Sequence, residues 1–179
     1  MAEGKAALPM IDRLRKFSIL VVDDDKLMQR LISDVLGKLG FGRIQKTGDG
    51  EQALLMLKAA PFDFVICDWR MPGMSGLEFV RHVRAADAPY SSIPVIMLTG
   101  NAEAEQVSAA RDAGINEYLI KPFTVKSLCQ RIEEIIEKPR EYVVSSGYKG
   151  PSQRRRALPP PSGMERRNVD RLSRSARDA

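Results

Sequence analysis

The stretch DFVICDWRMPGMSG, residues 63–76, decides the fold of this chain. Its apolar residues 64–67 end in a single carboxylate, Asp68, and the turn signal Met71-Pro72-Gly73 follows at once. This pattern predicts a buried strand that delivers one acid to its carboxyl end. Ligands of open parallel sheets bind outside the carboxyl ends of the strands, so Asp68 is a candidate site residue.

Three further apolar runs end in polar residues of the same kind. Residues 19–22 lead into Asp23, Asp24 and Asp25, residues 95–98 lead into Thr99, and residues 118–120 lead into Lys121. Because the carboxyl ends of parallel strands share one edge of a sheet, these acids, the hydroxyl and the amine are expected to lie together.

The apolar runs alternate with helical patterns between about residue 17 and residue 138. Strands are expected at 17–22, 43–46, 62–67, 93–98 and 118–120, and helices around 27–36, 53–57, 77–83, 102–113 and 125–136. Strict alternation of strand and helix predicts an α/β fold built on a parallel sheet.

The predicted cluster of acids suits a cation and a phosphoryl group. Asp23, Asp24 and Asp68 would repel one another unless a cation neutralised them, and oxygen ligands beside a phosphate suit Mg²⁺. The backbone carbonyl of Arg70 is placed to help, and Asp68 can then attack an electrophilic phosphorus. Thr99 and Lys121 can each contact a phosphoryl oxygen. Each of these residues has a simpler explanation when it is considered alone, since Asp25 and Thr99 could cap helices and Lys121 could be solvated.

Taken together, these motifs resemble the receiver domain of bacterial two-component response regulators, and CheY-like single-domain members in particular. The matching motifs are VVDD at 21–24, VICDWRMP at 65–72, MLTG at 97–100 and YLIKPF at 118–123. The resemblance implies a doubly wound, five-stranded parallel sheet of order 2-1-3-4-5. It also implies a sensor histidine kinase as the phosphoryl donor. A cytoplasmic location is expected from the sequence itself, because residues 1–16 carry scattered charges and no apolar stretch suitable for a secretory signal.

The resemblance also implies a role for each matching residue. Asp68 would be phosphorylated, and Mg²⁺ would be held by Asp68, Asp23, Asp24 and the Arg70 carbonyl. Thr99 and Lys121 would bind the phosphoryl group. Tyr118 would move with Thr99 as the output switch. Arg70 and Asn101 differ from their CheY counterparts beside the path of the attacking water, so the lifetime of the phosphate cannot be transferred from the family.

Charge divides the chain of 179 residues into unequal parts. Residues 140–179 carry ten Lys and Arg against four Asp and Glu, a net charge of +6, whereas the preceding residues net −1. We therefore expect an N-terminal extension at 1–15, the receiver domain at 16–138, and an Arg-, Pro- and Ser-rich tail at 139–179. Apolar residues in the tail are too sparse to offset chain entropy, which predicts disorder of the tail when alone.

Nine of the ten cations of the tail are Arg, which binds phosphate and guanine in bidentate fashion. The stretch from Tyr148 to Arg156 resembles the Arg-rich tails of CheY-like flagellar-motor regulators that bind cyclic di-GMP. The candidate ligand residues of the tail are Tyr148, Arg154, Arg155, Arg156, Arg166, Arg167, Asp170, Arg171, Arg174, Arg177 and Asp178. A solvated basic tail, or one that binds nucleic acid or acidic membrane, remains an alternative.

The sequence thus predicts a phosphorylation-controlled switch that binds a partner protein in chemotaxis or flagellar motor control. The only reactions that it is expected to catalyse are its own phosphorylation and dephosphorylation. One alternative is a phosphorelay intermediate or phosphate sink, in which Asp68 passes its phosphate onward. Another is a nucleic-acid binder driven by the tail, although no helix-turn-helix pattern follows the domain. No apolar run approaches the roughly 18 residues of a membrane span.

Overall fold

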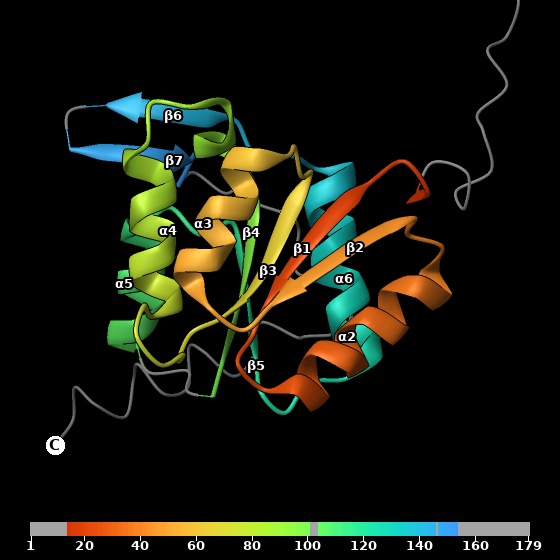
Figure 1. Ribbon diagram of the computed structural model, residues 1–179. Helices are drawn as coiled ribbons and strands as arrows, with labels where there is room; N and C mark the ends of the chain where they lie inside the picture. Colours follow the sequence, from red (N-terminus) through yellow and green to blue (C-terminus); the bar gives the residue numbers. More distant parts are fainter. Residues whose placement is uncertain (1–13, 101–103, 146, 154–179) are drawn as a thin grey trace, which may run out of the picture.

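The computed structural model describes residues 14–100, 104–145 and 147–153 (Figure 1). A five-stranded parallel sheet has the order β2-β1-β3-β4-β5, which confirms the predicted topology. Its strands are β1 (Ser18–Val22), β2 (Arg43–Thr47), β3 (Phe64–Asp68), β4 (Val95–Thr99) and β5 (Glu117–Ile120). The sheet continues without an antiparallel strand from β2 at one edge to β5 at the other.

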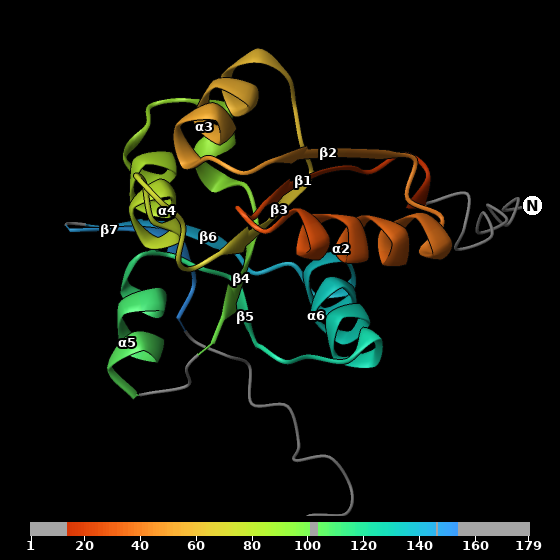
Figure 2. The same cartoon turned by 60° about the horizontal axis from the view of Figure 1, so that its bottom comes forward.

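Helices cover both faces of this sheet, as Figure 2 shows. One face carries α2 (Lys26–Leu39) and α6 (Val125–Glu137), and the other carries α3 (Gly50–Ala59), α4 (Gly76–Ala85) and α5 (Ala104–Asp112). A short 3₁₀ helix, η1 (Pro89–Ser92), joins α4 to β4. Strands covered on both faces must be apolar on both, which is why β1, β3 and β4 appear in the sequence as continuous apolar runs.

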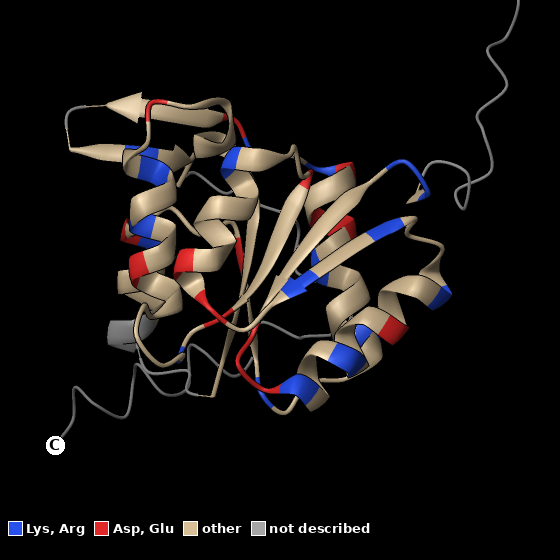
Figure 3. Cartoon of the chain, viewed as in Figure 1, with Lys and Arg blue, Asp and Glu red and all other residues tan. Residues whose placement is uncertain are grey.

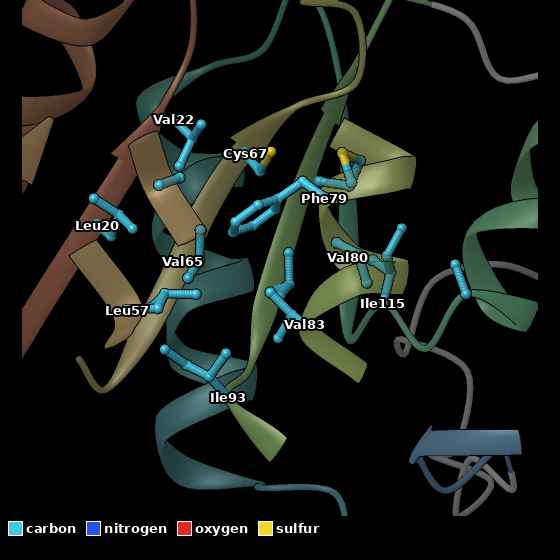
Figure 4. Packing of buried hydrophobic residues seen from close by; sticks show 14 of the residues in the cluster. Leu20, Val22, Leu57, Val65, Cys67, Phe79, Val80, Val83, Ile93 and Ile115 are labelled. Atoms are coloured by element: carbon cyan, nitrogen blue, oxygen red, sulfur yellow. The ribbon is translucent and has the colours of Figure 1, made fainter. Parts of the chain in front are cut away.

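Two apolar clusters hold the layers together. Figure 4 shows the cluster beneath α3, α4 and α5, where Phe79 of α4 packs against Val65 and Cys67 of β3. The second cluster lies beneath α2 and α6 and includes Ile32, Leu36, Leu128 and Ile132, together with Ile19, Val21, Phe64, Ile66, Ile96 and Leu98 of the strands. The strands that carry the site residues are therefore fixed from both sides.

Side chains at the helix starts position the loops of the site edge. Asp25 caps α2 by accepting the Leu27 N–H at 2.8 Å, as the sequence suggested. Ser75 caps α4 in a reciprocal arrangement with Glu78. A cap side chain satisfies backbone donors that the helix cannot pair itself, and so fixes where each loop ends and its helix begins.

The structure differs from the expected tail at residues 142–151. These residues form an antiparallel hairpin of β6 (Tyr142–Ser145) and β7 (Tyr148–Pro151), beside the C-terminal end of α4 (Figure 1). For this stretch the prediction of disorder is wrong, because it counted only the apolar residues of the stretch itself. Contacts with Arg84 and Gly114, distant in the sequence, stabilise the hairpin.

Among the described residues, no helix is both long enough and apolar enough to cross a lipid bilayer.

Candidate phosphoryl-acceptor site

Three carboxylates meet at the carboxyl edge of the sheet. Asp23 and Asp24 follow β1, and Asp68 is the last residue of β3; one oxygen of each lies within 4.8 Å of the others. Figure 3 shows these acidic segments where the strands end. The spacing is typical of a group that can hold a metal ion, and an all-oxygen set suits Mg²⁺.

Asp23 is the most firmly held of the three acids. Its side chain is buried, one carboxylate oxygen accepts the Asp25 N–H at 2.9 Å, and its own N–H donates to the Thr47 carbonyl at 3.1 Å. The Gln29 amide donates to the Asp23 carbonyl at 2.6 Å. The loop after β1 is thus fixed by α2 and by the end of β2.

Gln29 was missed by the sequence reasoning. It lies on the buried side of α2 with Ile32 and Leu36, and its side chain is only 4% exposed. The sequence did contain a signal for Gln29, because this polar residue has the same helical spacing as the apolar residues of α2. A buried amide needs a hydrogen-bond partner, so such a position indicates a structural contact.

Lys121 lies between two of the acids, directly after β5. Its amine is 2.9 Å from an Asp68 oxygen and 3.1 Å from an Asp23 oxygen. Burial opposes the charge of Lys121, but its hydrogen bonds and attraction to Asp68 and Asp23 outweigh this effect and raise the pKa of the amine. Lys121 is therefore a permanent cation at neutral pH. The peptide bond between Lys121 and Pro122 is cis.

The charge of the site remains negative despite Lys121. Burial raises the pKa of Asp23 above the usual Asp value, and the charge of Asp68 adds to this, whereas the Asp25 N–H and Lys121 oppose it. One ammonium faces three carboxylates, so a bound divalent cation would relieve the remaining repulsion.

Asp68 is supported by the loop that follows it. The Trp69 N–H donates to the Leu98 carbonyl at 2.8 Å, and the Gly76 N–H donates to the Trp69 carbonyl at 2.9 Å. A Cβ atom at Gly76 would overlap the backbone carbonyl oxygen of Asp68, so only glycine allows this close approach. The Asp68 side chain keeps 12% of its surface exposed and can be reached from solvent.

The remaining predicted site residues lie around this centre. Thr99 is the last residue of β4 and is buried, and its carbonyl accepts the Lys121 N–H at 2.6 Å. Tyr118 lies on β5 opposite Met97 and is half-buried against the apolar cluster. Arg70 is exposed, two residues beyond Asp68.

The candidate ligand residues of the tail are only partly described. Tyr148 belongs to β7, and its hydroxyl donates to the Pro151 carbonyl at 2.7 Å, which gives it a role within the hairpin. The others lie outside the described residues: Arg154, Arg155, Arg156, Arg166, Arg167, Asp170, Arg171, Arg174, Arg177 and Asp178.

A doubly wound sheet with three acids and a lysine at its carboxyl edge defines a receiver domain. The chain belongs to the response regulator receiver domain family, whose sequence profile matches residues 19–133. It is 42% identical over 124 residues to the chemotaxis protein CheY-3 of Vibrio cholerae, covering 69% of this chain and 95% of that protein. It is 44% identical over 120 residues to the chemotaxis protein CheY of Pseudomonas aeruginosa, covering 67% and 96%.

Solved structures show the same relationship. The chemotaxis protein CheY4 of Vibrio cholerae aligns with a TM-score of 0.63 at 31% identity, over 67% of this chain and 98% of that one. The receiver domain of a Pseudomonas aeruginosa sensor histidine kinase aligns with a TM-score of 0.62 at 31% identity, over 68% and 98%. That second structure has a magnesium ion coordinated in its active site cleft.

Proposed function

We propose that this chain is a phosphorylation-controlled switch in chemotaxis, in which Asp68 accepts a phosphoryl group from a sensor histidine kinase. One observation carries the proposal: the solvent-accessible Asp68 carboxylate lies 2.9 Å from the Lys121 amine and beside the carboxylates of Asp23 and Asp24. The similarity to CheY proteins of two species supports the chemotaxis role.

In the proposed reaction each side chain of the site has one task. An Asp68 oxygen attacks the phosphorus of a phosphohistidine, the P–N bond breaks, and its electron pair leaves with the imidazole, which takes up a proton. Lys121 stabilises charge on a phosphoryl oxygen, and the Thr99 hydroxyl donates to another. Asp23, Asp24 and Asp68, with the Arg70 carbonyl, would hold Mg²⁺, which neutralises phosphoryl charge when bound.

The output follows from the neighbouring strand β5. When Thr99 turns toward the phosphoryl group, space opens for Tyr118, and the surface of α5, β5 and α6 changes its affinity for a target protein. A flagellar motor component is the class of target proposed here. A phosphate sink would differ, since its phosphate would move onward without any change in target binding.

The test replaces the acceptor and spares the other acids. Asp68→Asn is expected to lose the acid-labile, Mg²⁺-dependent phosphorylation that acetyl phosphate gives the parent chain. Asp34→Asn, on the exposed side of α2, is the matched control and should label as the parent does. Undiminished labelling of Asp68→Asn would sink the assignment of the acceptor.

We also propose that the Arg-rich residues after the hairpin bind cyclic di-GMP. The support is compositional, because Arg combines bidentate phosphate contacts with guanine recognition and Lys does not. This proposal is independent of Asp68 and has its own test below.

A further inference from the structure

The β6–β7 hairpin is an addition to the receiver domain. It begins at Tyr142, beyond residues 19–133 that match the family. It lies beside the C-terminal end of α4, at the opposite end of the sheet from the acidic loops (Figures 1 and 3). A two-stranded hairpin is marginal by itself, so its contacts with the domain decide whether it forms.

Arg84 of α4 joins the hairpin to the domain. Its side chain is only 4% exposed, and its guanidinium donates to the backbone carbonyls of Gly114 at 3.0 Å, Ser91 at 2.6 Å and Ile93 at 2.8 Å. The same guanidinium lies 5.8 Å from the centre of the Tyr142 ring on β6, within the range of a cation–π contact. Arg84 thus contacts both the hairpin and the turn between α5 and β5.

The backbones of the hairpin and of this turn touch directly. A Cβ atom added to Gly150 of β7 would lie 2.8 Å from the Gly114 Cα atom, and one added to Gly114 would lie 2.9 Å from the Lys149 carbonyl oxygen. Such distances leave no room for a side chain at either position. The hairpin therefore rests on the α5–β5 turn, backbone against backbone.

A third contact ties the start of the hairpin to β5. Arg140 precedes β6, and its guanidinium lies 3.1 Å from an oxygen of the buried Glu117, the first residue of β5. Arg131 of α6 holds the other Glu117 oxygen at 3.1 Å. Gly114 and Glu117, which make these contacts, lie four residues and one residue before Tyr118 in the chain.

We propose that the hairpin is a regulatory element that fixes the α5–β5 turn and the start of β5, so that hairpin docking changes the affinity of the Asp68 site for a phosphoryl group. The inference rests on the proposed switch at Asp68 and Tyr118. Coupling is reciprocal, so a ligand that binds the docked and the undocked hairpin with different affinities also shifts the switch.

The experiment removes the docking contacts in the full-length chain. Gly150→Ala places a Cβ atom against the Gly114 backbone, and the double variant Gly150→Ala/Arg140→Gln also removes the ion pair with Glu117. Val144→Thr is the matched control, because Val144 lies on β6 with 66% of its surface exposed. Hydrogen exchange at the Ser152 amide, which donates to the Glu141 carbonyl across the hairpin, reports whether the hairpin is formed, and a two-stranded hairpin is marginal without its docking contacts.

The readout is the affinity for beryllofluoride with Mg²⁺, a mimic of the phosphoryl group, followed by Trp69 fluorescence. The affinity of the undocked variants for the mimic is expected to differ from that of the parent by roughly fivefold or more, within the range of typical coupling between sites. The Val144→Thr control should bind it as the parent does.

Equal binding by a variant that has lost Ser152 protection would overturn the coupling. Retained protection in the double variant would overturn the docking contacts themselves. A parent chain that fails to bind the mimic would instead remove the proposed function of Asp68, so the two failures are distinguishable.

Discussion

Asp23 and Asp24 are neighbours in the sequence but lie in different environments. The Asp23 carboxylate is buried, with one oxygen on the Asp25 N–H and the other on Lys121, whereas Asp24 is exposed. A hydrated ion can approach Asp24 and Asp68 from solvent, because magnesium retains several of its waters. Asp23 would join them in holding the ion, with a carboxylate whose position is fixed by the Asp25 N–H and by Lys121.

This difference predicts an unusual pH dependence of magnesium binding. Burial raises the pKa of Asp23, so this carboxyl takes up a proton at a higher pH than an ordinary Asp, whose pKa is about 3.9. Protonation removes a negative charge from the site, so Mg²⁺ affinity is complete well above the raised pKa and is lost as the pH falls through it. Trp69 fluorescence, titrated with Mg²⁺ at several pH values, measures the effect.

Asp23→Asn provides the control for that titration. The variant should bind Mg²⁺ more weakly at high pH, and the loss of affinity that belongs to protonation of Asp23 should be missing from its pH profile. The same midpoint in parent and variant would show that Asp23 does not control the pH dependence.

At the scale of the elements, the β3–α4 loop sets the shape of the site. The loop leaves β3 at Asp68 and returns to α4 at Gly76, whose N–H donates to the Trp69 carbonyl. Because the Gly76 Cα atom approaches the Asp68 carbonyl so closely, the length and path of the loop depend on that glycine.

Two glycine replacements are predicted to act in opposite directions. Gly76→Ala should lower the free energy of unfolding by about 2 kcal/mol or more, because the added Cβ atom overlaps the Asp68 backbone. Gly37→Ala, inside α2 with open space around it, should raise that free energy by about 0.5–1 kcal/mol. Urea denaturation of both variants tests this, and a Gly76→Ala chain as stable as the parent would refute the close approach.

The elements that the sequence predicted share one property, which is that their signal is local. Residues 64–68 show both their burial and their terminal acid within five positions, so β3 and Asp68 were predictable. The hairpin was missed because its stability comes from Arg84, Gly114 and Glu117, which lie far from it in the sequence. Gln29 was missed for a similar reason, since its partner is a backbone carbonyl that only the folded loop presents.

At the scale of the whole molecule, the acidic site and the hairpin lie at opposite ends of one sheet. Asp68 lies at the carboxyl edge, and the hairpin that leads into residues 154–179 lies at the other end (Figure 1). The strand β5 and the turn before it connect them, because Lys121 contacts Asp68 at one end while Gly114 and Glu117 contact the hairpin and the adjacent Arg140 at the other. In the proposed switch, such a chain combines a phosphorylation signal with a second signal.

The identity of that second signal is a prediction about residues 154–179. If their Arg side chains contact guanine and phosphate together, cyclic di-GMP should bind at least about fivefold more tightly than its adenine analogue of equal charge, since a bidentate contact to guanine discriminates by about 1–3 kcal/mol. A chain ending at Gln153 keeps the described hairpin, and should lose this binding while Asp68 is phosphorylated as before. A purely electrostatic tail would bind both nucleotides alike, and both affinities would fall together as salt rises. Calorimetric titration of the two nucleotides at two salt concentrations separates these cases, and equal affinities would leave only the solvated basic tail.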